Sequence, residues 1–168
     1  MSAKSALWVR DELARELARR RDSGTAARVV LANGCFDLLH VGHVRYLEDA
    51  RSRGDVLVVA LNTDESVRAL KGSARPLIAL AERAELVAAL RCVDYVTSFA
   101  ERDLEATLRA LRPAVHAKGT DYTAQNVPER AVDLELGVAI AICGDAKTRS
   151  SSELIARTAA GPFRGAGE

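Results

Sequence analysis

The chain has 168 residues, a length that suits a single compact domain. Apolar residues make up 48% of it and aromatic residues only 4%, so there is enough material for one buried core, which we expect to be aliphatic. A formal net charge of +1 gives no reason to expect nucleic acid or an anionic membrane as a partner, and three widely spaced cysteines, Cys35, Cys92 and Cys143, exclude a disulfide framework and lack the CxxC spacing of a zinc site.

The N-terminal segment lacks the basic-then-apolar pattern of a signal peptide, and no apolar run approaches the ~20 residues that cross a bilayer. We therefore expect a soluble, cytoplasmic protein. Residues 7–21 predict a helix, because Leu13 and Leu17 lie one turn apart and acidic residues stand four positions before arginines. Its arginines resemble a membrane or nucleic-acid arm, but the interleaved acids favour an ordinary solvated helix face.

Short β-branched runs alternate with helical stretches through the rest of the chain. The expected strands are Arg28–Ala32, Val56–Leu61, Val93–Thr97, Ala114–Ala117 and Val138–Ile142. The expected helices are Gly42–Arg53, Glu65–Leu70, Leu80–Leu90, Leu104–Leu111, about Pro128–Leu136, and Ser151–Thr158. Near-continuous apolar strands between helices predict an α/β fold with a doubly wound, mainly parallel five-stranded sheet and right-handed crossovers. One domain is expected over residues 1–160, with residues 1–27 as an N-terminal helical extension and residues 161–168 as a flexible tail.

Ligands of such sheets bind beyond the carboxyl ends of the strands, and the loop after the first of these strands carries the strongest pattern. Its residues 33–43 read Asn-Gly-Cys-Phe-Asp-Leu-Leu-His-Val-Gly-His. His40 and His43 straddle the start of a helix, so both imidazoles can project from one face. Gly42 between them removes a Cβ that would obstruct a bound group. The amides and partial positive charge of the helix N-terminus make this a phosphate site, where transfer at phosphorus needs in-line positioning and charge neutralisation.

Three other interpretations of this loop stay open from local pattern alone. The histidines could be half of a zinc site, although no partner ligands stand at suitable spacing. They could also be incidental capping residues. Gly34 could begin the dinucleotide fingerprint of a nicotinamide-dependent oxidoreductase, but GxGxxG is absent because Gly34 and Gly42 lie too far apart.

The sequence resembles the cytidylyltransferase-like nucleotidyltransferase superfamily over about Val29 to Ile155. GCFDLLHVGH (residues 34–43) matches the family's specific pattern GxFDxxHxGH in full. Similarity extends to VALNTD (59–64), LKGSARP (70–76), Glu82-Arg83, KGTDY (118–122) and the serine cluster Ser150–Ser152. Within the family, the sequence is most similar to the adenylyltransferases of ADP-heptose synthesis, and glycerol-3-phosphate cytidylyltransferases are similar too.

The resemblance implies in-line attack by a phosphate oxygen of an acceptor on the α-phosphorus of a nucleoside triphosphate, with release of pyrophosphate. The implied catalytic residues are His40 and His43, which would contact the α- and β-phosphates, and Lys71, which would reach the α-phosphate. The implied nucleotide-binding residues are Asn33, Gly34, Cys35, Phe36, Asp37, Gly42, Lys118, Ser150, Ser151 and Ser152. The implied acceptor-binding residues are Arg83, which would hold the acceptor phosphate, Asp64 and Asp121. Mg²⁺ would be bound through the triphosphate rather than by a metal site of the protein, and relatives are commonly homodimers.

Several of these residues also have a plainer interpretation. Lys71 and Lys118 are compatible with surface lysines, although each precedes a glycine at a loop where ligands are expected. Arg83 could pair with a neighbouring acid, and Asp37 is as compatible with holding its loop as with ligand contact. His116 lies within an expected strand, matches no motif and is predicted to be structural.

The chain departs from the heptose enzymes in three places. Phe99–Leu104 has no Thr-Pro, Val127–Arg130 replaces a Pro-Gly, and Lys147 and Arg149 add positive charge before the serine cluster. These changes leave the chemistry alone and concern the acceptor and the base. ATP with heptose 1-phosphate is our first prediction and CTP with glycerol 3-phosphate the second, followed by adenylyl transfer to riboflavin phosphate. The sequence is also compatible with a protein of a different class, a nucleotide-binding regulator that has the fold but no catalytic turnover.

Overall fold

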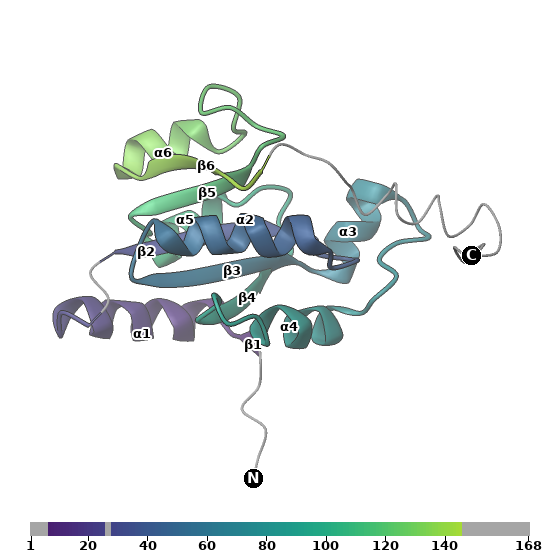
Figure 1. Ribbon diagram of the computed structural model, residues 1–168, viewed down its shortest axis with the longest axis horizontal. Helices are drawn as coiled ribbons and strands as arrows, with labels where there is room; N and C mark the ends of the chain where they lie inside the picture. Colours follow the sequence, from purple (N-terminus) through teal and green to yellow (C-terminus); the bar gives the residue numbers. More distant parts are fainter. Residues whose placement is uncertain (1–6, 26–27, 146–168) are drawn as a thin grey trace, which may run out of the picture.

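The computed structural model describes residues 7–25 and 28–145, and in this part of the chain six parallel strands form one sheet (Figure 1). The strands are β1 (Leu7–Trp8), β2 (Val29–Gly34), β3 (Val56–Asn62), β4 (Tyr95–Phe99), β5 (Val115–Gly119) and β6 (Ala139–Cys143), in the order β1-β4-β3-β2-β5-β6. The helices are α1 (Arg10–Asp22), α2 (Val41–Ser52), α3 (Asp64–Lys71), α4 (Leu80–Ala88), α5 (Glu105–Leu111) and α6 (Arg130–Leu136). The predicted α/β class and parallel sheet are confirmed.

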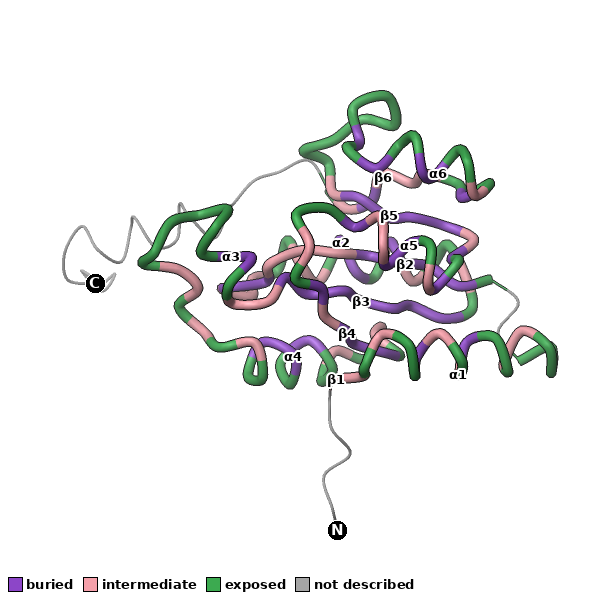
Figure 2. Tube along the Cα trace, turned by 180° about the vertical axis from the view of Figure 1, so that it is seen from behind, coloured by how far each residue is buried: buried purple, intermediate pink, exposed green. Residues whose placement is uncertain are grey.

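Helices cover both faces of the sheet, so it is doubly wound as predicted. Helices α2 and α4 pack on one face with Val30 and Ala32, whereas α1, α5 and α6 pack on the other with Val29 and Leu31. In Figure 2 the central strands run buried between these two layers. Burial on both faces explains why β2 and β3 are continuous apolar runs rather than alternating ones.

The sheet has one strand more than the five predicted. Leu7 and Trp8, expected in the first turn of a helix, instead pair with β4 at the edge of the sheet. The hydroxyl of Thr97 donates to the carbonyl of Trp8 at 3.0 Å, and the Trp8 ring packs edge-on against Tyr95 with centroids 5.3 Å apart. Because these two residues are extended, α1 begins at Arg10 rather than at residue 7.

The other predicted elements agree with the structure to within two residues at their ends. The strand expected at Val93–Thr97 begins two residues later, because Val93 closes a turn after α4 by donating to the carbonyl of Leu90 at 3.0 Å. The expected last helix, Ser151–Thr158, and the expected tail, residues 161–168, lie outside the described residues.

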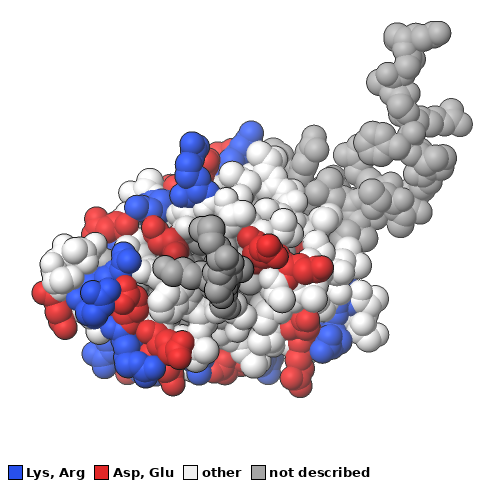
Figure 3. All heavy atoms as spheres, turned by 90° about the horizontal axis from the view of Figure 1, so that it is seen from below, with Lys and Arg blue, Asp and Glu red and all other residues white. Residues whose placement is uncertain are grey.

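The arginines of α1 lie on a mixed-charge surface. Leu13 and Leu17 are buried, and on the solvent side Glu16 pairs with Arg19 at 2.9 Å and Arg20 at 2.8 Å. On the face of the molecule shown in Figure 3, basic and acidic side chains are interspersed. This agrees with a solvated helix face rather than a basic arm. None of the helices in the described ranges is long and apolar enough to cross a membrane.

The order of the strands reverses between β2 and β5. From β2 the chain moves outward to β3 and β4, and it then returns to the other side of β2 to add β5 and β6. The loops that follow β2 and β5 therefore diverge at the carboxyl edge of the sheet and leave a crevice there. The HVGH loop follows β2 and the KGTDY loop follows β5, so the two motifs flank this crevice.

Candidate active site

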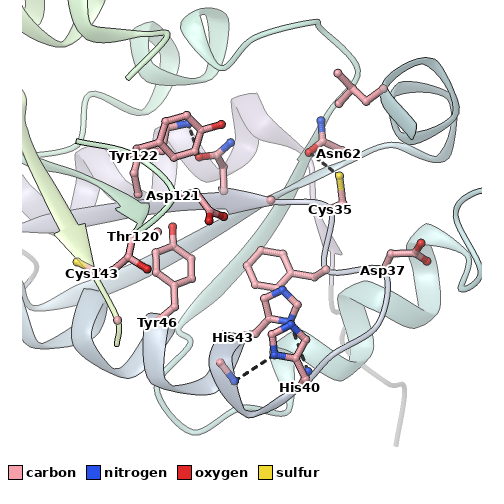
Figure 4. A pocket seen from close by; sticks show the side chains of 18 of the residues that line it. Cys35, Asp37, His40, His43, Tyr46, Asn62, Thr120, Asp121, Tyr122 and Cys143 are labelled. Atoms are coloured by element: carbon pink, nitrogen blue, oxygen red, sulfur yellow. Dashed lines mark hydrogen bonds between the residues drawn. The ribbon is translucent and has the colours of Figure 1, made fainter. Parts of the chain in front are cut away.

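A cleft of about 650 Å³ opens at this edge of the sheet (Figure 4). The predicted site residues that line it are Asn33, Gly34, Cys35, Phe36, Asp37, His40, Gly42, His43, Lys71, Lys118 and Asp121. Two predicted acceptor-binding residues, Asp64 and Arg83, are not part of its lining. Ser150, Ser151 and Ser152, with Lys147 and Arg149, lie outside the described residues.

The imidazoles of His40 and His43 stack at the N-terminus of α2, with centroids 3.9 Å apart and planes inclined by 28°. His40 is the N-cap of α2, and its Nδ1 accepts the N–H of Gly42 at 3.1 Å. Nδ1 of His43 accepts the N–H of His40 at 3.4 Å. Because each Nδ1 is an acceptor, each neutral ring carries its proton on Nε2. The backbone thus fixes the tautomer that can donate to an oxyanion. His40 is also a helix cap, as one interpretation of the sequence expected, and it still lines the cleft.

Two glycines permit this packing. A Cβ at Gly42 would lie 2.9 Å from Cε1 of His40, so the ring would have to move. A Cβ at Gly34 would lie 2.9 Å from the ring of Phe36, whose centroid is 4.9 Å from that of His43. The sequence suggested that Gly42 leaves room for a ligand, and in the structure the room is taken by the ring of His40.

Tyr46 joins α2 to the opposite wall of the cleft. Its hydroxyl donates to the carbonyl of Ala117 in β5 at 2.8 Å, and burial raises the pKa of this phenol. Gly144, after β6, approaches so closely that a Cβ there would lie 3.1 Å from Cα of Tyr46. The Gly144 N–H also donates to Asp49 at 2.8 Å. The loop after β6 therefore packs directly against α2.

Asp37 holds a loop, which is one of the two roles that the sequence left open for it. Its carboxylate is buried, pairs with the guanidinium of Arg75, and accepts the N–H groups of Leu77 at 2.6 Å and Ile78 at 3.2 Å. Both carboxylate oxygens are used in this way. Asp37 thus fixes the segment before α4 against the loop after β2, and it lines the cleft as a structural residue (Figure 4).

Arg83 occupies a different place from the one expected for an acceptor-phosphate ligand. Its side chain is fully buried, and its guanidinium donates to the carbonyls of Ile78 at 3.0 Å, Cys35 at 2.6 Å and Asn62 at 2.9 Å. It also pairs at 2.7 Å with Asp64, the other predicted acceptor ligand outside the cleft. In this arrangement Arg83 ties the ends of β2 and β3 to α4, so its charge is satisfied within the protein.

The two predicted lysines differ in their surroundings. Lys71 is exposed at the end of α3, and its side-chain ammonium makes no hydrogen bond or ion pair to any described residue. Lys118 is buried, donates to Oδ1 of Asn33 at 3.0 Å and lies 3.0 Å from Oε2 of Glu129. Burial raises the pKa of Glu129, but the charge of Lys118 and its hydrogen bond, with smaller contributions, together lower the pKa overall. The ring of Tyr122 lies 5.3 Å from the Lys118 ammonium.

The thiols and acids of the described residues form no disulfide or metal cluster. Cys35, Cys92 and Cys143 are free, and burial raises the pKa of all three, that of Cys143 to about 11. In the cleft, the thiol of Cys35 points to Oδ1 of Asn62 at 3.6 Å. No group of three His, Cys, Asp or Glu side chains within the described ranges could hold a metal ion.

The cleft also contains residues that the sequence did not identify as site residues. Arg102 and Asp103 line it from the loop after β4, and Arg45 lines it from α2 while pairing with Asp145 at 3.0 Å. Arg102 is exposed and has no hydrogen bond or ion pair to any residue in the described part. In the sequence, the signal that could have pointed to Arg102 and Asp103 was that Phe99–Leu104 lacks the Thr-Pro of the heptose enzymes.

Comparisons with known proteins agree with the motifs. The model of the family described as cytidylyltransferase-like matches residues 31–157. The chain is 48% identical over 145 residues to the bifunctional protein HldE of Geobacter sulfurreducens, which covers 86% of this chain and 29% of that protein. It is 57% identical over 109 residues to HldE of Geotalea uraniireducens, covering 65% of this chain and 21% of that protein.

A solved structure, the lipopolysaccharide core biosynthesis protein from Thermoplasma volcanium GSS1, is similar with a TM-score of 0.61 and 26% identity, over 71% of this chain and 98% of that chain. The HldE relatives are much longer than the region of similarity. The present chain therefore spans less than a third of the curated relatives that it matches.

Proposed function

The chain belongs to the cytidylyltransferase-like family, and from this premise we propose that it transfers the adenylyl group of ATP to a heptose 1-phosphate, giving an ADP-heptose and pyrophosphate. The observation that carries the proposal is the pair of stacked imidazoles at the N-terminus of α2, both with Nδ1 occupied by a backbone N–H. The similarity to HldE proteins favours this acceptor among those of the family. A cytoplasmic location, where ATP is available, belongs to the same proposal.

In the proposed reaction an anionic oxygen of the acceptor phosphate attacks the α-phosphorus. A new P–O bond forms as the bond from the α-phosphorus to the bridging oxygen breaks, and the electron pair leaves with pyrophosphate. No proton has to be moved, because the attacking oxygen is already ionised. The protein has to align the reactants and stabilise charge on the phosphate oxygens, which is the usual task in phosphoryl-type transfers.

The groups available for this task line the cleft. The Nε2–H groups of His40 and His43 would donate to oxygens of the α- and β-phosphates, assisted by the amides and dipole of the α2 N-terminus. Lys71 and Lys118 would supply positive charge. Mg²⁺ would arrive with the triphosphate, since this ion is usually held by substrate phosphates with few protein ligands.

The acceptor phosphate needs a cation other than Arg83 in this arrangement. Arg102 and Lys71 line the cleft, and their side chains make no hydrogen bond or ion pair to other described residues. A guanidinium is well suited to bidentate recognition of a phosphate. We therefore assign Arg102, in the loop after β4, to the acceptor phosphate.

The test is a pyrophosphate-release assay that crosses ATP and CTP with heptose 1-phosphate and glycerol 3-phosphate, with products identified by mass spectrometry. The proposal predicts turnover with ATP and heptose 1-phosphate and a product with the mass of an ADP-sugar. Turnover only with CTP and glycerol 3-phosphate would replace the proposed acceptor and base. Nucleotide binding by calorimetry without pyrophosphate release from any pair would support a non-catalytic regulator instead.

A further inference from the structure

Glu129 lies in the wall of the cleft, in contact with two elements that the proposed reaction uses. It is the N-cap of α6, yet its side chain makes no capping hydrogen bond to that helix. The side chain is instead buried and lines the cleft together with Lys118, Arg102 and Asp103. Glu129 stands in the segment 127–130, which replaces a Pro-Gly of the heptose enzymes, and the proposed reaction gives it no role.

The two carboxylate oxygens of Glu129 face different elements. Oε2 lies 3.0 Å from the Lys118 ammonium of β5, and no other described residue donates a hydrogen bond to this buried oxygen. Oε1 accepts the N–H of Leu104 at 3.3 Å. Both partners are donors, and a carboxylate can accept from both at once. An amide has one acceptor oxygen and would set its NH₂ group against one of the two donors.

On the side of β5, Glu129 fixes the direction of the Lys118 side chain. The ammonium is held between Oε2 of Glu129 and Oδ1 of Asn33, near the end of β2, and each oxygen is 3.0 Å away. Asn33 is neutral, so Glu129 supplies the counter-charge that a buried cation needs. Two of the three N–H groups of the ammonium face these oxygens, which leaves the third for a ligand in the cleft.

The other carboxylate oxygen fixes the end of the loop after β4. The Leu104 N–H that it accepts follows Arg102 and Asp103 directly in the chain, and the Leu104 side chain is fully buried. The start of the loop is held separately, since Glu101 pairs with Arg10 of α1 at 2.6 Å. Arg102 and Asp103 therefore lie between two anchored residues, while their own side chains are exposed at the cleft.

We propose that Glu129 is a positioning residue for both halves of the cleft: one oxygen holds the Lys118 ammonium toward the nucleotide, and the other holds the loop of Arg102 toward the acceptor phosphate. The inference rests on the proposed function, in which Lys118 and Arg102 serve the two substrates. Glu129 acts through these two elements and has no contact of its own with the reacting atoms. Without its carboxylate both cations remain in the protein, but neither keeps its fixed position.

The nucleotide side is tested by a double-mutant cycle on the affinity for MgATP, measured by calorimetry without acceptor. Glu129→Met and Lys118→Met should each weaken binding by about tenfold, the loss expected when a charge-assisted hydrogen bond is removed. Because Glu129 acts through Lys118, the double variant should bind MgATP like Lys118→Met alone. Losses that multiply to about a hundredfold would overturn this role, since a general structural defect acts independently of the lysine.

The acceptor side is tested by pyrophosphate release and by hydrogen exchange. In Glu129→Met the KM for the acceptor should rise by about tenfold, and the Leu104 amide should exchange faster because its hydrogen bond is lost. Arg10→Met releases only the start of the loop, so it should raise the same KM without weakening MgATP binding. A fall in kcat alone would contradict the proposal, because a smaller folded fraction lowers kcat but changes neither KM nor Kd. Glu135→Gln, in an exposed pair with Arg109 on the same helix as Glu129, is the matched control and should alter none of these values.

The outcomes separate this inference from the proposed function. If no acceptor is turned over, the proposed reaction is wrong, and the MgATP cycle and the exchange of the Leu104 amide still decide whether Glu129 holds its two partners. A wild-type chain that does not bind MgATP would refute both. If Glu129→Met matches the wild type in MgATP affinity, acceptor KM and Leu104 exchange, the positioning role is refuted. Should Glu129→Met fail to fold, Glu129→Gln takes its place, and with one acceptor oxygen for two donors it must weaken at least one side.

Discussion

At His40 and His43 the ring nitrogens are fixed by backbone N–H groups rather than by acidic side chains. A carboxylate at Nδ1 would favour an imidazolium or a general base, as in catalytic triads. An amide donor at Nδ1 instead favours the neutral tautomer with a proton on Nε2. This tautomer suits a transfer in which the attacking phosphate oxygen is already ionised. Such a reaction needs no base, but it needs hydrogen-bond donors that stabilise the charge on the phosphate oxygens in the transition state.

The His43→Ala variant tests this role at the level of one residue. Removing one preorganised donor from a developing oxyanion typically costs roughly 10²–10³ in rate, so kcat should fall by that factor while thermal unfolding is nearly unchanged. The measurement is pyrophosphate release under saturating substrates. Glu48→Gln, exposed on the same helix, serves as the control and should retain wild-type kcat. An unimpaired His43→Ala enzyme would be incompatible with the assigned role.

Gly42→Ala separates activity from stability. The new Cβ would lie 2.9 Å from Cε1 of His40, so the ring must leave its position, and kcat should fall by at least about tenfold, the cost of disturbing one donor. Stability should change by no more than about 1 kcal/mol, because alanine favours a helix over glycine while the loss of the His40 cap on the N–H of residue 42 offsets this gain. Steady-state kinetics and a urea melt measure the two effects. Normal kcat would mean that the position of the His40 ring is unimportant.

At the scale of elements, Arg83 connects three segments that are separate in sequence. Its guanidinium donates hydrogen bonds to the carbonyls of Cys35 after β2, Asn62 at the end of β3 and Ile78 before α4. Each carbonyl is at or near the carboxyl edge of the sheet. The arginine therefore helps to keep the loop after β2 in register with the rest of the cleft without facing the cleft itself.

Arg83→Met should destabilise the protein severely. It leaves three carbonyls and Asp64 without their buried partner, and breaking such an arrangement from one side costs about 3–5 kcal/mol in the free energy of unfolding. Urea unfolding of Arg83→Met and of Arg68→Met, an exposed control on α3, gives the comparison. If Arg83→Met is as stable as the control but has a strongly raised KM for the acceptor, Arg83 binds the acceptor phosphate after all.

The elements of the sheet were largely predictable because β2 to β6 are apolar runs flanked by helices of ordinary length. The motif at residues 34–43 likewise predicted which loop would line the cleft. β1 was missed because two residues give no periodicity and adjoin a helical pattern, so only their pairing with β4 identifies them. The buried position of Arg83 could not be predicted from the sequence either, since most of its partners are backbone carbonyls distant in sequence.

The contacts among four buried residues of β5 and α6, His116, Lys118, Glu129 and Asp133, were only partly predictable. Lys118 belongs to a motif, but Glu129 and Asp133 had no recognisable pattern, and His116 was expected to be merely structural. What relates the four residues is the register between β5 and α6, which is a property of tertiary packing. A single sequence carries no local signal for such a contact.

For the whole molecule, acid should destabilise the fold through carboxylates that have partners in the folded state. The pKa of Glu129 is lowered in the folded state, because the charge and the hydrogen bond of Lys118, with smaller contributions, together outweigh burial. That of Asp49 is lowered because the Gly144 N–H, Arg53 and Ser52 together outweigh burial. A lowered folded pKa gives stability that is present above the unfolded value, 4.5 for Glu129, and is lost as the pH falls.

The free energy of unfolding should therefore be nearly constant near neutral pH and decrease as the pH falls below about 4.5. Glu129→Gln should be less stable at pH 7 but lose less on acidification, because it lacks one of the titrating groups. Urea melts at a series of pH values measure both curves. Parallel curves for the two proteins would mean that Glu129 does not titrate differently in the folded and unfolded states.

The measurement that addresses the central claim most directly is a crystal structure of the protein with Mg²⁺ and a non-hydrolysable ATP analogue. Nε2 of His40 and of His43 should each lie within about 2.7–3.2 Å of an oxygen of the α- or β-phosphate, above the N-terminus of α2. A triphosphate bound away from both rings, or a metal ion ligated by the rings in its place, would contradict the account.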